Sequence, residues 1–101
     1  MRKDNRLEEC LGENITLIGT YVKPKGVTHK RMVFDNVIIA DTEESIGHIN
    51  IMKYDVIKTN KNINHMKFNS KFIIKGFVTK YTRLDGTEGY GLKEVILEKI
   101  N

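Results

Sequence analysis

The sequence predicts a single, mainly β domain whose five strands curl into a small barrel. Two long β patterns, residues 15–22 and 72–81, are each interrupted by a central glycine, Gly19 and Gly76. A glycine weakens a strand, so finding one inside two long strands indicates places where a sheet bends sharply. An Asp-Gly pair at 85–86 supplies a hairpin turn. The chain has 101 residues, enough for one modest core, so no second domain is expected.

The first half of the chain predicts a polar leader and two strands. Residues 1–13 are mostly polar and precede the predicted domain, residues 14–101. The first strand covers 14–23 and ends before Pro24, which lacks a backbone donor. The second strand covers 31–41, and alternation divides its apolar residues between two faces. One face takes Met32, Phe34, Ile38 and Ala40, and the other takes Val33, Val37 and Ile39.

The second half predicts three more strands and one irregular segment. A polar turn leads to a third strand at 48–53. The period-two pattern then fades over 54–69, where we expect an irregular connection or one short helix. The fourth strand covers 71–82 and the fifth covers 90–100, joined by the Asp-Gly hairpin. Strand alternation would place Leu92, Ile96 and Ile100 on one face of the fifth strand.

Composition favours a cytoplasmic protein with a polyanionic partner. Seventeen Lys and Arg residues against thirteen Asp and Glu residues give a formal charge of +4 and a pI near 9.2. Cys10 is the only cysteine, which excludes an intramolecular disulfide and a cysteine-rich zinc site and indicates a reducing compartment. The N-terminus lacks a signal-peptide pattern, and no apolar run is long enough to cross a membrane.

The order of the predicted blocks resembles an OB-fold, a five-stranded Greek-key barrel. The resemblance covers residues 15–100 and implies a helix or irregular segment between strands three and four. It rests on segments IGTYV at 18–22, FDNVIIAD at 34–41, GHINI at 47–51 and FIIKGFV at 72–78. The ending at 80–93 is also similar to small OB-like proteins of phages, plasmids and other mobile elements of low-GC bacteria.

The resemblance implies a site for single-stranded nucleic acid. OB domains commonly bind single strands across strands two and three, with the loops between strands one and two and between strands four and five closing over them. In this chain those loops are basic, so their cations would neutralise phosphates while nearby tyrosines stack on bases. The candidate binding residues are Tyr21, Lys23, Lys25, His29, Lys30, Arg31, His48, Asn50, Lys80, Tyr81, Arg83 and Tyr90.

Each of these residues also has a structural interpretation. The tyrosines would pack at the ends of the barrel with their hydroxyls in water, and His48 and Asn50 would form a solvated face. The three histidines are too scattered to indicate a metal site, and no cofactor is expected. The sequence has no phosphate-binding glycine loop, nucleophile elbow or deaminase signature, and no base lies near Cys10, so no enzyme is expected.

The sequence therefore favours a non-catalytic module that binds single-stranded nucleic acid, DNA more than RNA, with little sequence preference. A homodimer would double its footprint. The alternative is a protein-interaction module of a phage or mobile element that inhibits or recruits a host protein. Asp35, Asp41, Glu43 and Glu44 favour this alternative, because they would repel nucleic acid if they lay in the cleft. A third reading, a small-molecule or oligosaccharide binder, would require a pocket at the mouth of the barrel.

Overall fold

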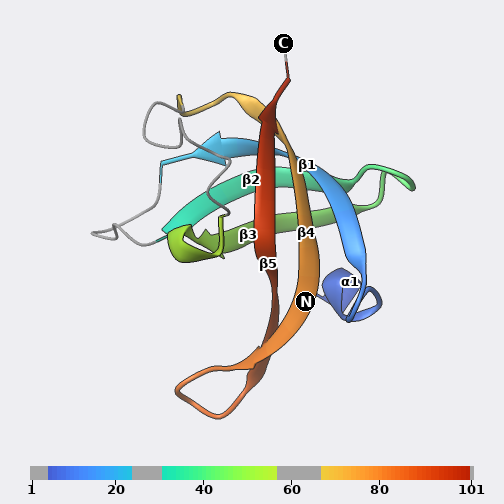
Figure 1. Ribbon diagram of the computed structural model, residues 1–101, viewed down its shortest axis with the longest axis vertical. Helices are drawn as coiled ribbons and strands as arrows, with labels where there is room; N and C mark the ends of the chain where they lie inside the picture. The colour runs from blue at the N-terminus through green and yellow to red at the C-terminus, as the bar shows by residue number, and fades with distance from the viewer. Residues whose placement is uncertain (1–4, 24–30, 57–66, 101) are drawn as a thin grey trace.

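Five antiparallel strands in one sheet dominate the fold (Figure 1). The computed structural model describes residues 5–23, 31–56 and 67–100. The strands are β1 (Asn14–Val22), β2 (Arg31–Ile39), β3 (Ser45–Met52), β4 (Lys71–Thr82) and β5 (Glu88–Lys99), and the helices are α1 (Asn5–Glu8) and the 3-10 helix η1 (Lys53–Asp55). Their order in the sheet is β3-β2-β1-β4-β5. The prediction of a mainly β chain with five strands is confirmed.

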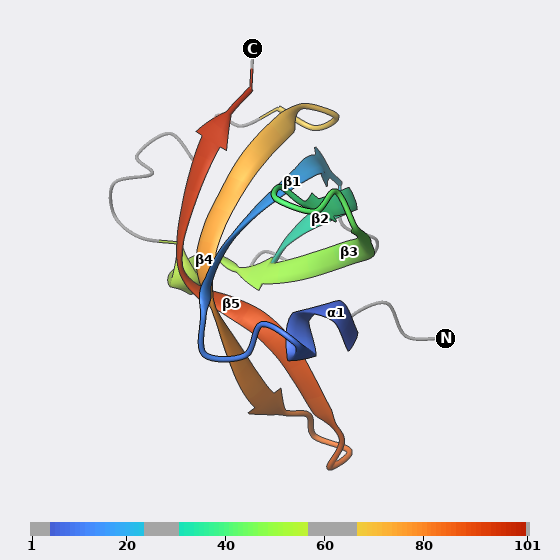
Figure 2. The same cartoon turned by 90° about the vertical axis from the view of Figure 1, so that its right-hand side faces the viewer.

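The sheet is strongly coiled but does not close into the predicted barrel (Figure 2). Closure would require β3 to pair with β5, the two edge strands. Within the described residues, a single isolated parallel bridge between Val56 and Val95 links the chain after β3 to β5. The chain leaves β3 at Met52 and turns through η1, so it runs beside β5 for too short a distance to form a ladder. Of the predicted irregular segment, residues 57–66 lie outside the described residues.

Helix α1 covers the open side of the sheet, where it lies against β3, β4 and β5 (Figure 2). Its Leu7 side chain is only 1% exposed and belongs to the main core. The turn after α1 is tied to the sheet, because Gly12 N–H donates to Val78 O at 3.1 Å and Val78 N–H donates to Glu13 O at 3.0 Å. The polar composition of residues 1–13 did not predict this contribution to the core.

Gly19 bends β1 at a bulge in β2. Ile18 pairs with Ile38 and Thr20 pairs with Asp35, so Gly19 alone lies opposite two residues of β2, Asn36 and Val37. An unequal count of this kind is a β-bulge, which bends and twists the sheet locally. Asn36 has a φ of 51°, in the left-handed region that Asn tolerates better than most residues.

Gly76 repeats this arrangement between β4 and β5. Lys75 pairs with Ile96 and Phe77 pairs with Lys93, so Gly76 lies opposite Glu94 and Val95. Glu94 has a φ of 53°. Both glycines that predicted bends in the sheet therefore lie opposite a bulge whose first residue has a positive φ.

The two bulges reverse the predicted alternation of side chains. Val37 rather than Ile38 is buried beside Phe34, so the predicted division of the β2 side chains into two faces is wrong beyond the bulge. In β5, Val95 is buried and Ile96 is only half-buried, so the predicted face of Leu92, Ile96 and Ile100 is also wrong. The reason is the same in both strands, because one extra residue shifts every later side chain to the other face.

The core lies on the concave side of the coiled sheet and consists of aliphatic and aromatic side chains. No polar or charged side chain of the described residues is buried. The core members are Leu7, Leu17, Tyr21, Met32, Phe34, Val37, Ile46, Ile49, Ile51, Phe72, Ile74, Val78, Leu92 and Val95. No helix in the described part of the chain combines the length and apolar character needed to span a membrane.

Candidate nucleic-acid interface

The cations predicted on the β4–β5 hairpin are engaged within the hairpin. Lys80 Nζ lies 3.2 Å from Glu88 Oε2, and this hydrogen-bonded ion pair raises the pKa of Lys80. The guanidinium of Arg83 lies 5.5 Å from the centre of the Tyr81 ring. Its Nη1 donates to Thr87 Oγ1 at 3.3 Å and to Glu88 O at 2.5 Å. These contacts hold both side chains against the hairpin, and Glu88 balances the charge of Lys80.

Tyr81 also has a structural role in this hairpin. Its ring lies over Gly89 and Gly91 of β5: a Cβ atom on Gly89 would be 2.7 Å from Tyr81 Cζ, and one on Gly91 would be 3.5 Å from Tyr81 Cε1. The ring is 48% exposed, with Arg83 packed against it. Tyr90 is half-buried, and burial, followed by the charges of Glu8 and Glu88, raises the pKa of its hydroxyl.

Tyr21 lies in the core and is not an open stacking surface. Its side chain is 8% exposed, and burial raises the pKa of its hydroxyl. The ring centre lies 5.4 Å from that of Phe34, 4.9 Å from that of Phe68 and 6.3 Å from that of Phe72. This packing corresponds to the structural interpretation of the tyrosines rather than to base stacking.

The remaining predicted residues divide into three groups. Lys23 and Arg31 are exposed at the end of β1 and the start of β2. His48 and Asn50 are exposed on the outer face of β3, because the intervening Ile49 points into the core. The other predicted residues, Lys25, His29 and Lys30, lie outside the described residues.

One end of the sheet collects a cation from every strand. Because neighbouring strands are antiparallel, the last residues of β1, β3 and β5 and the first residues of β2 and β4 lie at this same end of the sheet. We call the exposed cations found there the basic end, and they are Lys23, Arg31, Lys53, Lys67, Lys71 and Lys99. None of them forms an ion pair with another residue of the described ranges. By contrast, Lys75, farther along β4, pairs with Glu98 at 3.2 Å.

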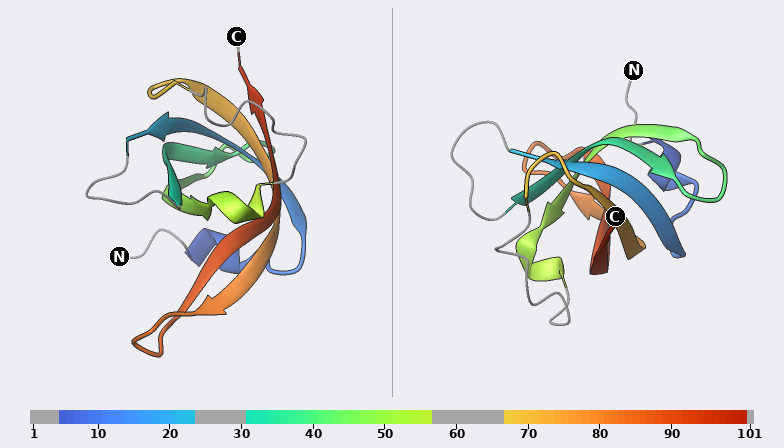
Figure 3. Two further views of the ribbon diagram at one scale, coloured as in Figure 1. Left: turned by 60° about the vertical axis from the view of Figure 1, so that its left-hand side comes forward. Right: turned by 90° about the horizontal axis from the view of Figure 1, so that it is seen from above.

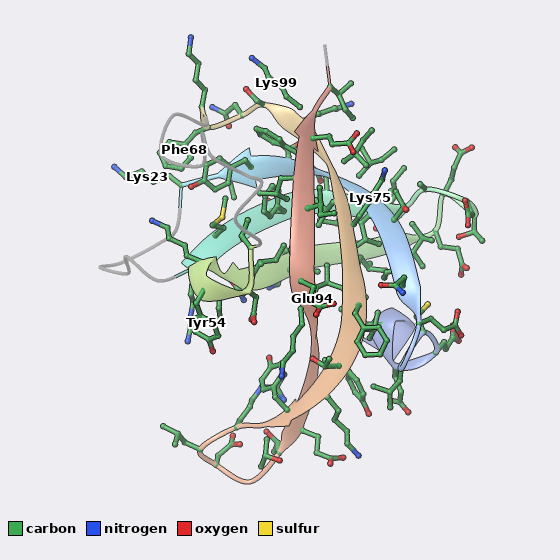
Figure 4. The ribbon with its side chains drawn as sticks, viewed as in Figure 1. Lys23, Tyr54, Phe68, Lys75, Glu94 and Lys99 are labelled. Atoms are coloured by element: carbon green, nitrogen blue, oxygen red, sulfur yellow. The ribbon has the colours of Figure 1, made fainter. Side chains whose placement is uncertain are left out.

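Phe68 provides an aromatic surface at the basic end. Its side chain is 45% exposed, and its ring rests on that of Tyr21. Two backbone hydrogen bonds hold this segment against β1: Asn69 N–H donates to Tyr21 O at 2.6 Å, and Tyr21 N–H donates to Ser70 O at 2.9 Å. In Figure 4, Phe68 lies on the same side of the molecule as Lys23. The arrangement combines a supported aromatic ring with cations from the neighbouring strands.

Helix η1 adds a second exposed aromatic side chain to the basic end. Tyr54 follows Lys53 directly and is 77% exposed, and Figure 4 shows it pointing away from β3. Its neighbour Asp55 is an acidic residue at this end. Burial raises the pKa of the Asp55 carboxyl, and the positive charge of Lys93 partly opposes that rise.

Acidic side chains gather at the opposite end of β1 and β2. Glu13 precedes β1, while Asp41 and Glu43 follow β2. Beside them, burial and the charges of Glu13, Glu9 and Glu44 raise the pKa of the Cys10 thiol. The length of β2, about 26 Å, separates Asp41 and Glu43 from Arg31. Of the four acidic residues that argued against nucleic acid, only Asp35 lies within a strand.

Four cations of the basic end and both exposed aromatics beside it were not among the residues predicted from the sequence. These residues are Lys53, Tyr54, Lys67, Phe68, Lys71 and Lys99. A charge pattern could have indicated several of them, because residues 23–34 and 56–84 hold eleven of the seventeen Lys and Arg residues and no Asp or Glu. That pattern becomes a site only when β1 lies between β2 and β4, which brings the end of β1 and the starts of β2 and β4 to one end of the sheet (Figure 3).

Comparisons with family models, curated proteins and solved structures gave no match. Within the described ranges, no three His, Cys, Asp or Glu side chains converge on a position that could hold a metal ion. The candidate site therefore depends on the geometry and charge of the basic end itself.

Proposed function

We propose that this chain is a non-catalytic module that binds single-stranded nucleic acid, more DNA than RNA, through the basic end of its sheet. The observation that carries the proposal is that six exposed cations and the exposed ring of Phe68 lie at the same end of the five-stranded sheet. Cations that have no protein partner can replace the counterions of phosphates, and the release of those counterions drives binding. An exposed aromatic ring stacks on any base, so the site would have little sequence preference.

The overall charge supports a ligand of modest length. A net charge of +4 allows only a few phosphates to be neutralised at once, unless a second copy adds its own site. In the sequence, segments 24–30 and 57–66 contain four lysines and no Asp or Glu. The coiled five-stranded sheet and its two glycine bends support an OB-like module as part of the proposal.

Fluorescence anisotropy of labelled single-stranded DNA, single-stranded RNA and duplex DNA across a salt series tests this function. We expect the tightest binding to single-stranded DNA, with log K falling by about 0.7 per neutralised phosphate for each tenfold rise in salt. Phe68→Leu should weaken binding, because it removes the stacking surface and keeps an apolar side chain on Tyr21.

Tyr81→Leu is the matched control, since Tyr81 is exposed to nearly the same extent but lies on the hairpin. The proposal expects this variant to retain wild-type affinity. Loss of binding with Tyr81→Leu and not with Phe68→Leu would move the site to the hairpin. No binding of any nucleic acid at low salt and micromolar protein would reject the proposal and favour the protein-interaction alternative.

A further inference from the structure

We infer that the basic end holds two bases of one short single strand at the same time, one on Tyr54 and one on Phe68. The inference rests on the proposed function and specifies how the strand lies. These two rings are the exposed aromatics of the basic end in the described ranges. They belong to different strand ends, because Tyr54 follows β3 and Phe68 precedes β4.

The sheet order sets the separation of the two strand ends beside which the rings lie. From β3 to β4 there are three strand spacings, since β2 and β1 lie between them. At about 4.8 Å per spacing the ends of β3 and β4 are about 14 Å apart. Stacked nucleotides rise by about 3.4 Å, so this span corresponds to about four nucleotides, and an unstacked strand would cover it with fewer.

The residues between the two rings suit the backbone of such a strand. Arg31 begins β2 and Lys23 follows β1, so both cations lie between Tyr54 and Phe68 along this edge. Both are exposed, and neither pairs with an acidic residue in the described part of the chain. In the order Tyr54, Arg31, Lys23, Phe68, a ring that can stack on a base lies at each end, and two cations that can contact phosphates lie between the rings.

A nucleic-acid strand that ran along β4 toward the β4–β5 hairpin would have less support from the structure. Twelve-residue β4 places the hairpin about 36 Å along the chain from Lys71. The hairpin aromatic Tyr81 already packs against Gly89, Gly91 and Arg83. The bound strand therefore crosses the strand ends, and its footprint is short.

Binding of short oligothymidylates tests the two positions separately. Unlabelled dT2, dT4, dT6 and dT12 would compete with a labelled dT12 probe for wild type, Tyr54→Leu, Phe68→Leu and the double variant. Affinity should rise steeply up to dT4 or dT6 and only slightly beyond. With dT6, each single variant should lose roughly 5- to 150-fold, the range for one stacked base, and the double variant should lose about the product.

The dinucleotide dT2 supplies the discriminating result, because it is too short to reach both rings. With dT2, each single variant should lose only about twofold, since the other ring still binds, whereas the double variant should lose the full stacking contribution. If Tyr54→Leu leaves dT6 affinity unchanged while Phe68→Leu lowers it, the two-base inference is wrong and the proposed function stands. If wild type binds none of the oligothymidylates, both the inference and the proposed function fail. Thermal unfolding followed by circular dichroism should show that both variants stay folded, because Tyr54 is 77% exposed and leucine at position 68 keeps an apolar side chain on Tyr21.

Discussion

Gly19 of β1 lies so close to Val37 of β2 that a Cβ atom on Gly19 would be 2.9 Å from Val37 Cγ2. The same atom would be 3.3 Å from Phe34 Cβ. Both neighbours are fully buried, so neither has room to move. The bend in β1 and the bulge in β2 therefore depend on each other.

Gly19→Ala should destabilise the protein by about 1–3 kcal/mol, because the added methyl group overpacks this part of the core. Urea unfolding measures the effect. The control is Gly91→Ala, where the new Cβ would make an ordinary 3.5 Å contact with Tyr81 Cε1. An equal loss of stability in the two variants would contradict a specific role for the close approach at Gly19.

Glu94→Gly should stabilise the chain relative to Glu94→Ala by about 1 kcal/mol. Glu94 has a positive φ, and the left-handed region costs an L-residue about 1–2 kcal/mol that glycine does not pay. Alanine removes the same charge but keeps the strain, so the comparison of the two variants isolates the backbone effect. Asn36→Gly should gain less, because Asn tolerates this region. Equal stabilities of the two position-94 variants would show that the backbone at the bulge is not strained.

Leu7→Ala should cost about 2–4 kcal/mol, although α1 is a single turn near the N-terminus. The Leu7 side chain is buried where α1 covers the open side of the sheet, so its removal leaves a cavity. Leu11→Ala removes a similar but exposed side chain and should change stability by less than about 0.5 kcal/mol. Calorimetric unfolding of both variants would distinguish a helix packed into the core from a dispensable leader.

Asp55 and Asp85 should give opposite pH dependences of stability. Burial raises the pKa of Asp55, so the folded protein favours its protonated form. That contribution to stability is present at low pH and is lost as the pH rises through the raised pKa. Asp55→Asn should therefore be more stable than wild type at pH 7, with the difference closing near pH 3.

For Asp85, hydrogen bonds from the Thr87 hydroxyl and backbone N–H lower the pKa of the carboxyl. Its contribution is present at neutral pH and is lost as the pH falls through the lowered pKa. Asp85→Asn should thus be less stable than wild type at pH 7, again with the difference closing at low pH. Urea unfolding at a series of pH values checks both signs, and the same sign for both variants would contradict the assignment.

The strands could be predicted well from the sequence because alternation and turn residues are local patterns. Alternation and turn residues identified all five, and Gly19 and Gly76 marked the bends correctly. The faces beyond Asn36 and Glu94 were mispredicted, because the glycine that shapes each bulge lies on the neighbouring strand. No pattern within β2 or β5 alone indicates the extra residue.

The candidate site was harder to predict because it depends on which strands are neighbours. Lys80, Arg83 and Tyr81 looked available in sequence, but their partners Glu88, Thr87 and Gly89 lie across the hairpin. Lys71 begins β4, which is an internal strand of the sheet. Its place beside Lys99 follows from the pairing of β4 with β5, which no local motif reveals.

The most direct test of the basic end compares two double variants with the same net charge. Lys71→Gln with Lys99→Gln removes two cations of the basic end that belong to the paired strands β4 and β5. Lys75→Gln with Lys80→Gln removes two lysines that are paired with Glu98 and Glu88. The measurement is the affinity for single-stranded DNA as a function of salt. The first double variant should bind more weakly, with a salt slope smaller by about 1.4, the share of two phosphate contacts, and the second should match wild type. Equal losses in both double variants, or a loss confined to the second, would contradict a binding site at the basic end.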